Sequence, residues 1–251
     1  MRYPYLSCFL ILLSAVCTPA QNGEKDALKF YNDGIHLLAE QKYDAAIESL
    51  SRAAALENSN PIYNYNLGIA HFRAADFARA AESFRRVTRL RPNDALAHNQ
   101  LGVTLIELDR RDEAIDELET AVKLKPNDPV ILMNAGYAFV SAGKFKQAVS
   151  YLERARSADP DNFEIRVNLG YSYSKRDEMR KAIIEFEYAV RLRPDEPNAQ
   201  YFLGNLYLAA KDRTAAIRQQ KAVERLSPEL GRKLFREIFS DKLLVVGEGN
   251  Q

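Results

Sequence analysis

Five carboxamide side chains recur along this 251-residue chain at a constant interval. Each follows the previous one by 34 residues, at Asn32, Asn66, Gln100, Asn134 and Asn168. A carboxamide carries one acceptor oxygen and a pair of N–H donors, which match the carbonyl and amide groups of a peptide backbone. A regular row of carboxamides can therefore hydrogen-bond an extended polypeptide with little regard to its sequence. The series ends at the next step, where Phe202 stands.

Tyrosines flank these carboxamides at fixed offsets. One residue before the row or before Phe202 stand Tyr31, Tyr65 and Tyr201, and three residues after it stand Tyr137, Tyr171 and, in place of a tyrosine, Asn205. Tyrosine combines apolar contact area with a hydroxyl group, as recognition surfaces often do. In the alternative interpretation, the carboxamides are solvated or bonded within their own repeat, and the tyrosines pack between helices.

The elements that position these side chains follow the same interval. The markers are glycine at 34, 68, 102, 136, 170 and 204, alanine at 46, 80, 114, 148, 182 and 216, and proline at 92, 126, 160, 194 and 228. They divide the chain into units at 27–60, 61–94, 95–128, 129–162, 163–196 and 197–230. Proline ends a helix and small residues permit close helix crossings, so we expect two tightly packed helices in each unit. N-capping side chains are expected at Asn60, Asp94, Asp128 and Asn162, with Glu196 as a weaker cap.

The unit length and its markers resemble those of the tetratricopeptide repeat (TPR) family. Leucine precedes the glycine at 67, 101, 169 and 203, and aromatic residues follow it by three at 139, 173 and 207. The resemblance covers about four-fifths of the chain and implies an all-α, right-handed superhelical solenoid of six TPR helix pairs. It also implies that the first helix of each pair lines a concave groove, so that the carboxamides and tyrosines face into it. The row is similar to the asparagine row of the O-GlcNAc transferase family, which grips extended polypeptide.

The chain departs from the TPR pattern in a few places. With Ala27 as repeat position 1, the family's tryptophan at position 4 is replaced by Phe30, Asn64, His98, Leu132, Arg166 and Gln200. Gln220 stands where an apolar residue is expected. The lysines with which chaperone-binding TPR domains clamp a terminal carboxylate are absent at positions 2 and 5.

The sequence shows no recognisable catalytic motif. His36, His71 and His98 occupy positions normally used for packing and show no zinc-like spacing to acidic residues. There is also no glycine-rich phosphate loop and no nucleophile elbow. We therefore expect no enzyme activity, no cofactor and no metal, and the formal net charge of +1 argues against nucleic acid as a partner.

The first 20 residues are typical of a secretion signal. Arg2 precedes an apolar core at 6–16, and small residues at 18–20 suit cleavage before Gln21. This predicts an exported scaffold, periplasmic or extracellular. An alternative remains open, because residues 13–17 resemble a lipoprotein cleavage box in which Cys17 is lipidated. The protein would meet a membrane only in that case, as a lipid-anchored assembly factor similar in layout to type IV pilus pilotins.

The remaining segments predict a cap and two loose ends. A helix from Pro228 carries an apolar stripe of Leu230, Leu234, Phe235, Ile238 and Phe239, suited either to covering the open end of the last repeat or to docking a partner helix. Residues 21–26 and the tail at Gly247 and Gly249 are expected to be loose. Repeat two is rich in arginine and repeat three in acidic residues, which predicts mutual attraction or, alternatively, a basic patch for an acidic partner.

The sequence thus favours a non-enzymatic scaffold that binds an extended protein segment in a TPR groove. The partner's identity and the oligomeric state stay open.

Overall fold

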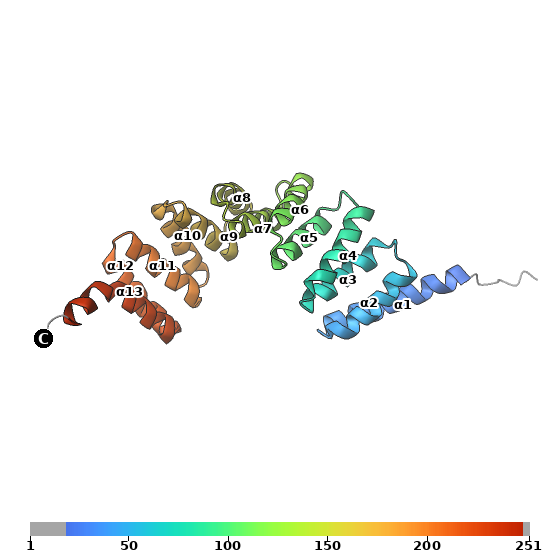
Figure 1. The fold of residues 1–251 in the computed structure, drawn as a ribbon, viewed down its shortest axis with the longest axis horizontal. Helices are drawn as coiled ribbons and strands as arrows, with labels where there is room; N and C mark the ends of the chain where they lie inside the picture. Colours follow the sequence, from blue (N-terminus) through green and yellow to red (C-terminus); the bar gives the residue numbers. More distant parts are fainter. Residues whose placement is uncertain (1–18, 248–251) are drawn as a thin grey trace, which may run out of the picture. The chain divides into compact units, whose positions relative to one another are not determined.

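A computed structural model describes residues 19–247 of the chain, with side chains from 23 to 240. Thirteen α-helices and no strands occupy this described part (Figure 1). The helices form two compact units, an N-terminal unit that ends at Asp76 and a C-terminal unit that begins at Phe77. The secretion signal and Cys17 lie outside the described residues.

The N-terminal unit contains three helices. They are α1 (Pro19–Ala39), α2 (Tyr43–Leu56) and α3 (Pro61–Arg73). Helix α2 packs on both neighbours, and α1 also contacts α3. Residues 21–26 lie within α1, so the expectation that this segment is loose is wrong. Nothing in 21–26 is a proline, and Gly23 interrupts the helix only at a modest cost of about 1 kcal/mol.

The C-terminal unit contains ten helices, each of which packs on the next. They are α4 (Phe77–Leu90), α5 (Ala95–Glu107), α6 (Arg111–Leu124), α7 (Pro129–Ser141), α8 (Phe145–Ala158), α9 (Phe163–Lys175), α10 (Met179–Leu192), α11 (Pro197–Ala209), α12 (Arg213–Leu226) and α13 (Pro228–Gly247). One continuous apolar core extends from α5 to α11.

The first helices of successive pairs come closer together than the second helices do. Helix α5 contacts α7, and α7 contacts α9. No comparable contact joins α6 to α8 or α8 to α10 in the part of the chain that the structure describes. The first helices therefore line the inner side of the C-terminal unit, as the solenoid geometry requires.

Glycine is needed where the two helices of a pair cross. A Cβ atom on Gly102 or Gly136 would lie 2.5 Å from the Cγ atom of the leucine opposite, Leu118 or Leu152. On Gly34 it would lie 2.6 Å from the Cγ atom of Leu50. Only a residue without a side chain permits this approach. The close packing of the two helices therefore explains why glycine recurs at a constant interval along the chain.

Helix ends follow the expected capping chemistry. The side chains of Asn60, Asp94 and Asp128 each accept two backbone N–H groups at the start of the following helix, and Asn162 accepts one. Glu196 accepts one weak hydrogen bond, from the Asn198 N–H at 3.4 Å. Glu196 is therefore the poorer cap that the sequence predicts.

The turn inside each pair has a left-handed residue at repeat position 15. The φ values lie between 59° and 70° at Gln41, Ala75, Asp109, Gly143, Asp177 and Lys211. Glycine occupies this conformation without strain, yet five of these six described positions carry a side chain. The rest of the hairpin thus imposes the turn.

Helix α13 covers the last helix pair. Leu234 and Ile238 are buried and join Ala216 and Val223 of α12 in one apolar cluster. Leu234 also fills the space above Gly204 that position 24 fills in other pairs, which explains how Gln220 is tolerated there. Phe235 departs from the expected stripe, since its side chain is 45% exposed. The helix continues to Gly247, and the rest of the predicted loose tail lies outside the described residues.

Candidate functional site: the first-helix face

None of the five carboxamides in the row is buried. Asn32 is exposed, and the other four are half-buried. In the N-terminal unit, Asn66 Nδ2 donates to the Ile62 carbonyl at 2.9 Å and to the Tyr31 hydroxyl of α1 at 3.4 Å. The row therefore faces the neighbouring first helix and solvent, not the interior of a hairpin.

In the C-terminal unit the row continues on α5, α7 and α9. Asn134 Nδ2 donates to Asn99 Oδ1 across α7 and α5 at 2.9 Å, and Asn168 Nδ2 donates to the Glu164 carbonyl at 2.9 Å. Within the described residues, the Gln100 side chain makes no hydrogen bond, and the carboxamide oxygens of Asn134 and Asn168 accept none. Bonding within the array thus uses some of the donors, while the acceptors remain accessible.

The tyrosines beside the row differ in exposure. Tyr137 is 44% exposed on α7, whereas Tyr65 is half-buried on α3. Tyr31 stacks on Tyr63, with ring centroids 4.9 Å apart. These three tyrosines supply apolar contact area on the first helices, with Tyr137 the most accessible.

The two remaining tyrosines lie near the end of the row. Tyr171 meets Phe145 and Phe202 edge-on, at 6.1 and 6.5 Å between ring centroids. The Tyr201 hydroxyl donates to Glu237 of α13 at 2.8 Å. Asn205 is half-buried on α11 and makes no side-chain hydrogen bond in the described part of the chain.

Polar side chains at repeat position 4 join consecutive repeats. Each donates to the backbone carbonyl at position 32 of the preceding repeat, at 2.8–3.0 Å: Asn64 to Asn58, His98 to Pro92, Arg166 to Pro160 and Gln200 to Pro194. The exception is Leu132, where Arg154 of α8 donates to the Pro126 carbonyl instead, at 2.7 Å. From sequence, position 4 shows only that tryptophan is missing. The recurrence of donors four residues after the cap is the signal that would have revealed this link.

Three of these side chains, those of His98, Arg166 and Gln200, also bind the second helix of their own repeat, at position 23. Asn64 instead donates a second time to the preceding repeat, at the Asn60 carbonyl. His98 Nδ1 lies 2.6 Å from Glu117 Oε2, and Gln200 accepts from Gln219. Arg166 Nη1 donates to Glu185 Oε2 at 2.7 Å. On α5, α9 and α11, position 4 therefore holds the first helix against its own second helix, on the side opposite to positions 6 and 9.

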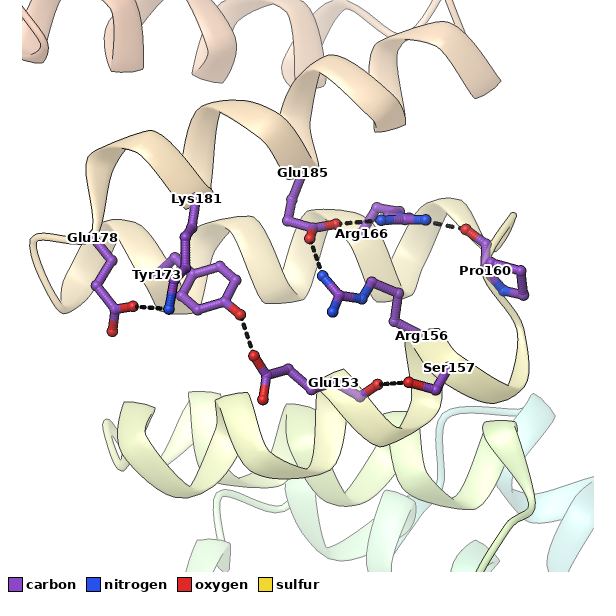
Figure 2. Close-up of polar contacts among 9 residues, drawn as sticks. All are labelled: Glu153, Arg156, Ser157, Pro160, Arg166, Tyr173, Glu178, Lys181 and Glu185. Carbon is purple, nitrogen blue, oxygen red and sulfur yellow. Dashed lines mark hydrogen bonds and ion pairs between the residues drawn. The ribbon is translucent and has the colours of Figure 1, made fainter.

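The most extensive of these links holds α9 between α8 and α10 (Figure 2). Glu185 is 2% exposed and accepts from both Arg156 of α8 and Arg166 of α9. The Arg166 guanidinium also lies 3.9 Å from the centroid of the Tyr188 ring. Two cations therefore surround one buried carboxylate, and this network sets the orientation of the helix that carries Asn168 and Tyr171.

Tyrosine–glutamate pairs connect first helices to the preceding second helix. Tyr173 donates to Glu153 of α8, and Tyr207 donates to Glu187 of α10 at 2.6 Å (Figure 2 shows the first pair). Burial, followed by the hydrogen bond to the carboxylate, raises the pKa of both tyrosine hydroxyls well above the ordinary value of 10.0. Both tyrosines thus remain neutral donors at any physiological pH.

The expected electrostatic attraction between the second helices of repeats two and three, α4 and α6, is weak in the structure. Arg85 of α4 and Glu113 of α6 lie 3.9 Å apart, and Arg110 binds Glu113 more closely at 2.6 Å. Exposed pairs of this kind contribute about 0–1 kcal/mol to stability. The outer charges therefore add little to the order of the repeats.

The described residues contain no group of three or more His, Cys, Asp or Glu side chains that could hold a metal ion. Nor does any helix among them combine the length and apolarity needed to cross a bilayer.

Comparison with known proteins places this architecture in a family. The tetratricopeptide repeat model matches residues 31–95, 65–129, 133–197 and 168–230. These ranges cover well over half of the chain, so the chain belongs to the tetratricopeptide repeat family. Its helices and its structural neighbours place it among the all-α TPR solenoids. No curated protein sequence matches it.

Several solved structures share the fold. A double mutant of MamA RS-1 is 25% identical, with a TM-score of 0.64 over 67% of this chain and 95% of MamA. PilF of Pseudomonas aeruginosa is 18% identical, with a TM-score of 0.71 over 86% of this chain and 99% of PilF. YrrB, described as a TPR protein with an unusual peptide-binding site, is 21% identical, with a TM-score of 0.61 over 78% of this chain and 99% of YrrB. Proteins of this family are generally non-catalytic scaffolds that bind peptides or proteins, and the fold indicates a protein–protein interaction scaffold here.

Proposed function

We propose that this protein binds an extended segment of another protein along the face formed by its first helices. The observation that carries this proposal is the row of accessible carboxamides on α5, α7 and α9 of the C-terminal unit. The N-terminal unit presents the same side-chain type at the same repeat position on α1 and α3. A protein with a peptide-binding site among the structural neighbours is in keeping with this use of the fold.

The geometry of the row suits a peptide backbone. Packed helices lie about 8–10 Å apart, and an extended chain advances about 3.3 Å per residue, so each repeat spans roughly three ligand residues. The accessible carboxamide oxygens can accept backbone N–H groups, and the carboxamides on α5, α7 and α9 each keep at least one N–H for a backbone carbonyl. Binding of this kind depends on an extended backbone more than on side-chain identity.

The test removes two carboxamides that bind no other side chain. Gln100→Ala combined with Asn168→Ala is measured by fluorescence anisotropy against a permanently unfolded probe, reduced and carboxymethylated α-lactalbumin. Loss of two hydrogen bonds of about 0.5–1.5 kcal/mol each predicts roughly a tenfold rise in Kd. Gln147→Ala, an exposed carboxamide on α8, is the matched control and should leave Kd unchanged. Equal affinity of the double variant and the control would remove the row from the binding mechanism.

Export and location form part of the proposal. Residues 1–20 favour cleavage before Gln21 and a periplasmic or extracellular protein. The second candidate function keeps the same groove but tethers it to a membrane through lipidated Cys17, as a cell-envelope or pilus assembly factor. It is favoured by the cleavage box at 13–17. Mass spectrometry of the mature N-terminus separates the two, because an N-terminal Gln21, free or cyclised, excludes the lipid.

A further inference from the structure

The carboxamide row ends in an aromatic site on α9 and α11. Phe202 occupies repeat position 6, where the five preceding repeats carry a carboxamide, and its side chain remains 43% exposed. Its ring stacks on Phe186 at 5.8 Å between centroids and meets Tyr171 and Tyr201 edge-on at 6.5 and 6.2 Å. Tyr171 and Tyr201 are themselves half-buried. Three rings thus contact one partly exposed phenylalanine, with Phe186 on its buried side.

Two lysines border this site. Lys175 Nζ lies 5.3 Å from the centroid of the Tyr171 ring, and Lys233 Nζ lies 5.1 Å from that of Tyr201. Both lysines are exposed, and neither forms an ion pair with a carboxylate in the described part of the chain. The carboxylate of Glu237 accepts from the Tyr201 hydroxyl, and the pKa of Lys233 is raised by its hydrogen bond to Tyr201 and, to a lesser extent, by the charge of Glu237.

Packing alone does not account for the phenylalanine. Repeat position 6 accepts asparagine or glutamine in the other repeats of the same fold, and the core beneath it is already closed by Phe186, which is 1% exposed. An accessible ring within edge-to-face distance of two others offers the geometry that a further aromatic ring prefers. Cations on both sides attract carboxylates and repel lysine or arginine.

We propose that Phe202, Tyr171 and Tyr201 form an anchor site for an aromatic side chain that is flanked by acidic residues in the bound segment. This proposal rests on the proposed function, because it assigns side-chain specificity to one end of the same groove. Backbone hydrogen bonds along Gln100, Asn134 and Asn168 then hold the adjoining part of the segment, and the anchor fixes its register.

Three fluorescein-labelled peptides on a glycine–serine background test the anchor with the full chain. They carry a central Asp-Phe-Glu, Lys-Phe-Lys or Asp-Ser-Glu. An anchor of this kind predicts that the Asp-Phe-Glu peptide binds about tenfold more tightly than either of the others. Phe202→Asn, which restores the side chain of other repeats, should abolish the preference for phenylalanine. Lys175→Gln combined with Lys233→Gln should abolish the preference for acidic flanks.

Two controls separate the anchor from the fold and from the row. Ile184→Asn removes an apolar side chain that is 58% exposed on α10 and should leave all three affinities unchanged. Phe202→Leu keeps an apolar side chain but loses the ring, so it should retain the fold and lose the preference. The melting temperatures of Phe202→Asn and Phe202→Leu are compared, so that a loss of binding caused by unfolding is distinguished from the loss of the ring.

The outcomes distinguish the two proposals. If all three peptides bind alike, and the Gln100→Ala and Asn168→Ala variant weakens all of them, the anchor is overturned and the groove stands. If only the Phe202 and lysine variants change binding, the anchor stands and the carboxamide row does not. If no peptide binds, or if the Lys-Phe-Lys peptide binds most tightly, the anchor proposal is wrong.

Discussion

Glu185 is the one buried carboxylate among the residues that the structure describes, and two arginines surround it. Burying a charge is costly unless partners satisfy it, and removing one partner leaves the others without compensation. The cluster therefore contributes orientation and specificity to α8, α9 and α10. Well-packed apolar residues often replace buried ion pairs without loss of stability, so orientation is the property that an apolar replacement would not supply.

Glu185→Gln should lower the free energy of unfolding by about 3 kcal/mol, the lower end for a broken buried pair, since Arg156 retains some access to solvent. Glu164→Gln is the matched control, because it breaks an exposed ion pair with Arg193 in the same repeat and should change stability by less than about 1 kcal/mol. Urea unfolding followed by circular dichroism measures both. Similar midpoints for the two variants would show that the buried cluster is not a structural constraint.

Tyr173 and Tyr207 predict an alkaline limit to stability. Their pKa values are raised in the folded protein above the ordinary value of 10.0, mainly by burial and then by the glutamate that each binds. Because the folded pKa exceeds the unfolded one, their contribution is fully present below about pH 10 and is lost as the pH rises through the folded value. Tyr173→Phe combined with Tyr207→Phe should reduce the fall in urea midpoint between about pH 9 and pH 11. An unchanged fall in this variant would assign the alkaline loss to other groups.

At the scale of elements, the crossing of two helices depends on the absence of a single atom. Gly102→Ala should destabilise the protein by about 1–3 kcal/mol, because the new Cβ atom would lie 2.5 Å from Leu118 Cγ. Gly23→Ala is the same chemical change in α1, where no atom lies within 4 Å of the new Cβ, and it should stabilise by about 0.5–1 kcal/mol. Thermal unfolding of the two variants measures the contrast. Equal shifts of the same sign would refute the packing explanation for the glycine interval.

Much of each helix pair was predictable, because its signals are local. The caps at Asp94 and Asp128, the helix-starting Pro129 and the small residues at the crossings act within one repeat or between neighbours, and the sequence contains both members of each contact. The resemblance to the TPR family implied that the carboxamides lie on the accessible side of the first helices. Their exact hydrogen-bond partners could not be predicted, because the bond from Asn134 to Asn99 depends on how closely α5 and α7 approach.

Other features required the folded chain. The acceptor of Arg166 is a backbone carbonyl, which leaves no trace in residue types. The aromatic site around Phe202 joins side chains from α8 to α11 whose positions within the repeat differ. The ring contacts at Phe202 occur at one repeat only, so the 34-residue period does not encode them.

At the scale of the C-terminal unit, α13 should act as a capping helix that stabilises the last helix pair. Leu234 is fully buried and fills the space above Gly204, so Leu234→Ala should cost about 2–5 kcal/mol through transfer and cavity terms. In a repeat array each element is stabilised chiefly by its neighbours, so the loss should fall on α11, α12 and α13. Hydrogen exchange by mass spectrometry measures the distribution. Equal loss of protection from α5 to α13 would indicate a single cooperative unit.

The position 4 donors affect how readily repeats can be added to or removed from such a chain. His98, Arg166 and Gln200 each donate to a backbone carbonyl of the preceding hairpin, and the second partner of each belongs to its own hairpin. A duplicated or deleted 34-residue segment would therefore keep this joint intact, because a main-chain oxygen is available at every junction. The side-chain contact between positions 4 and 23 lies within one repeat and is duplicated with it. The contact between repeats uses a main-chain carbonyl, which every repeat has. Repeats could therefore be duplicated or deleted in the gene without new residues being needed at the interface between repeats.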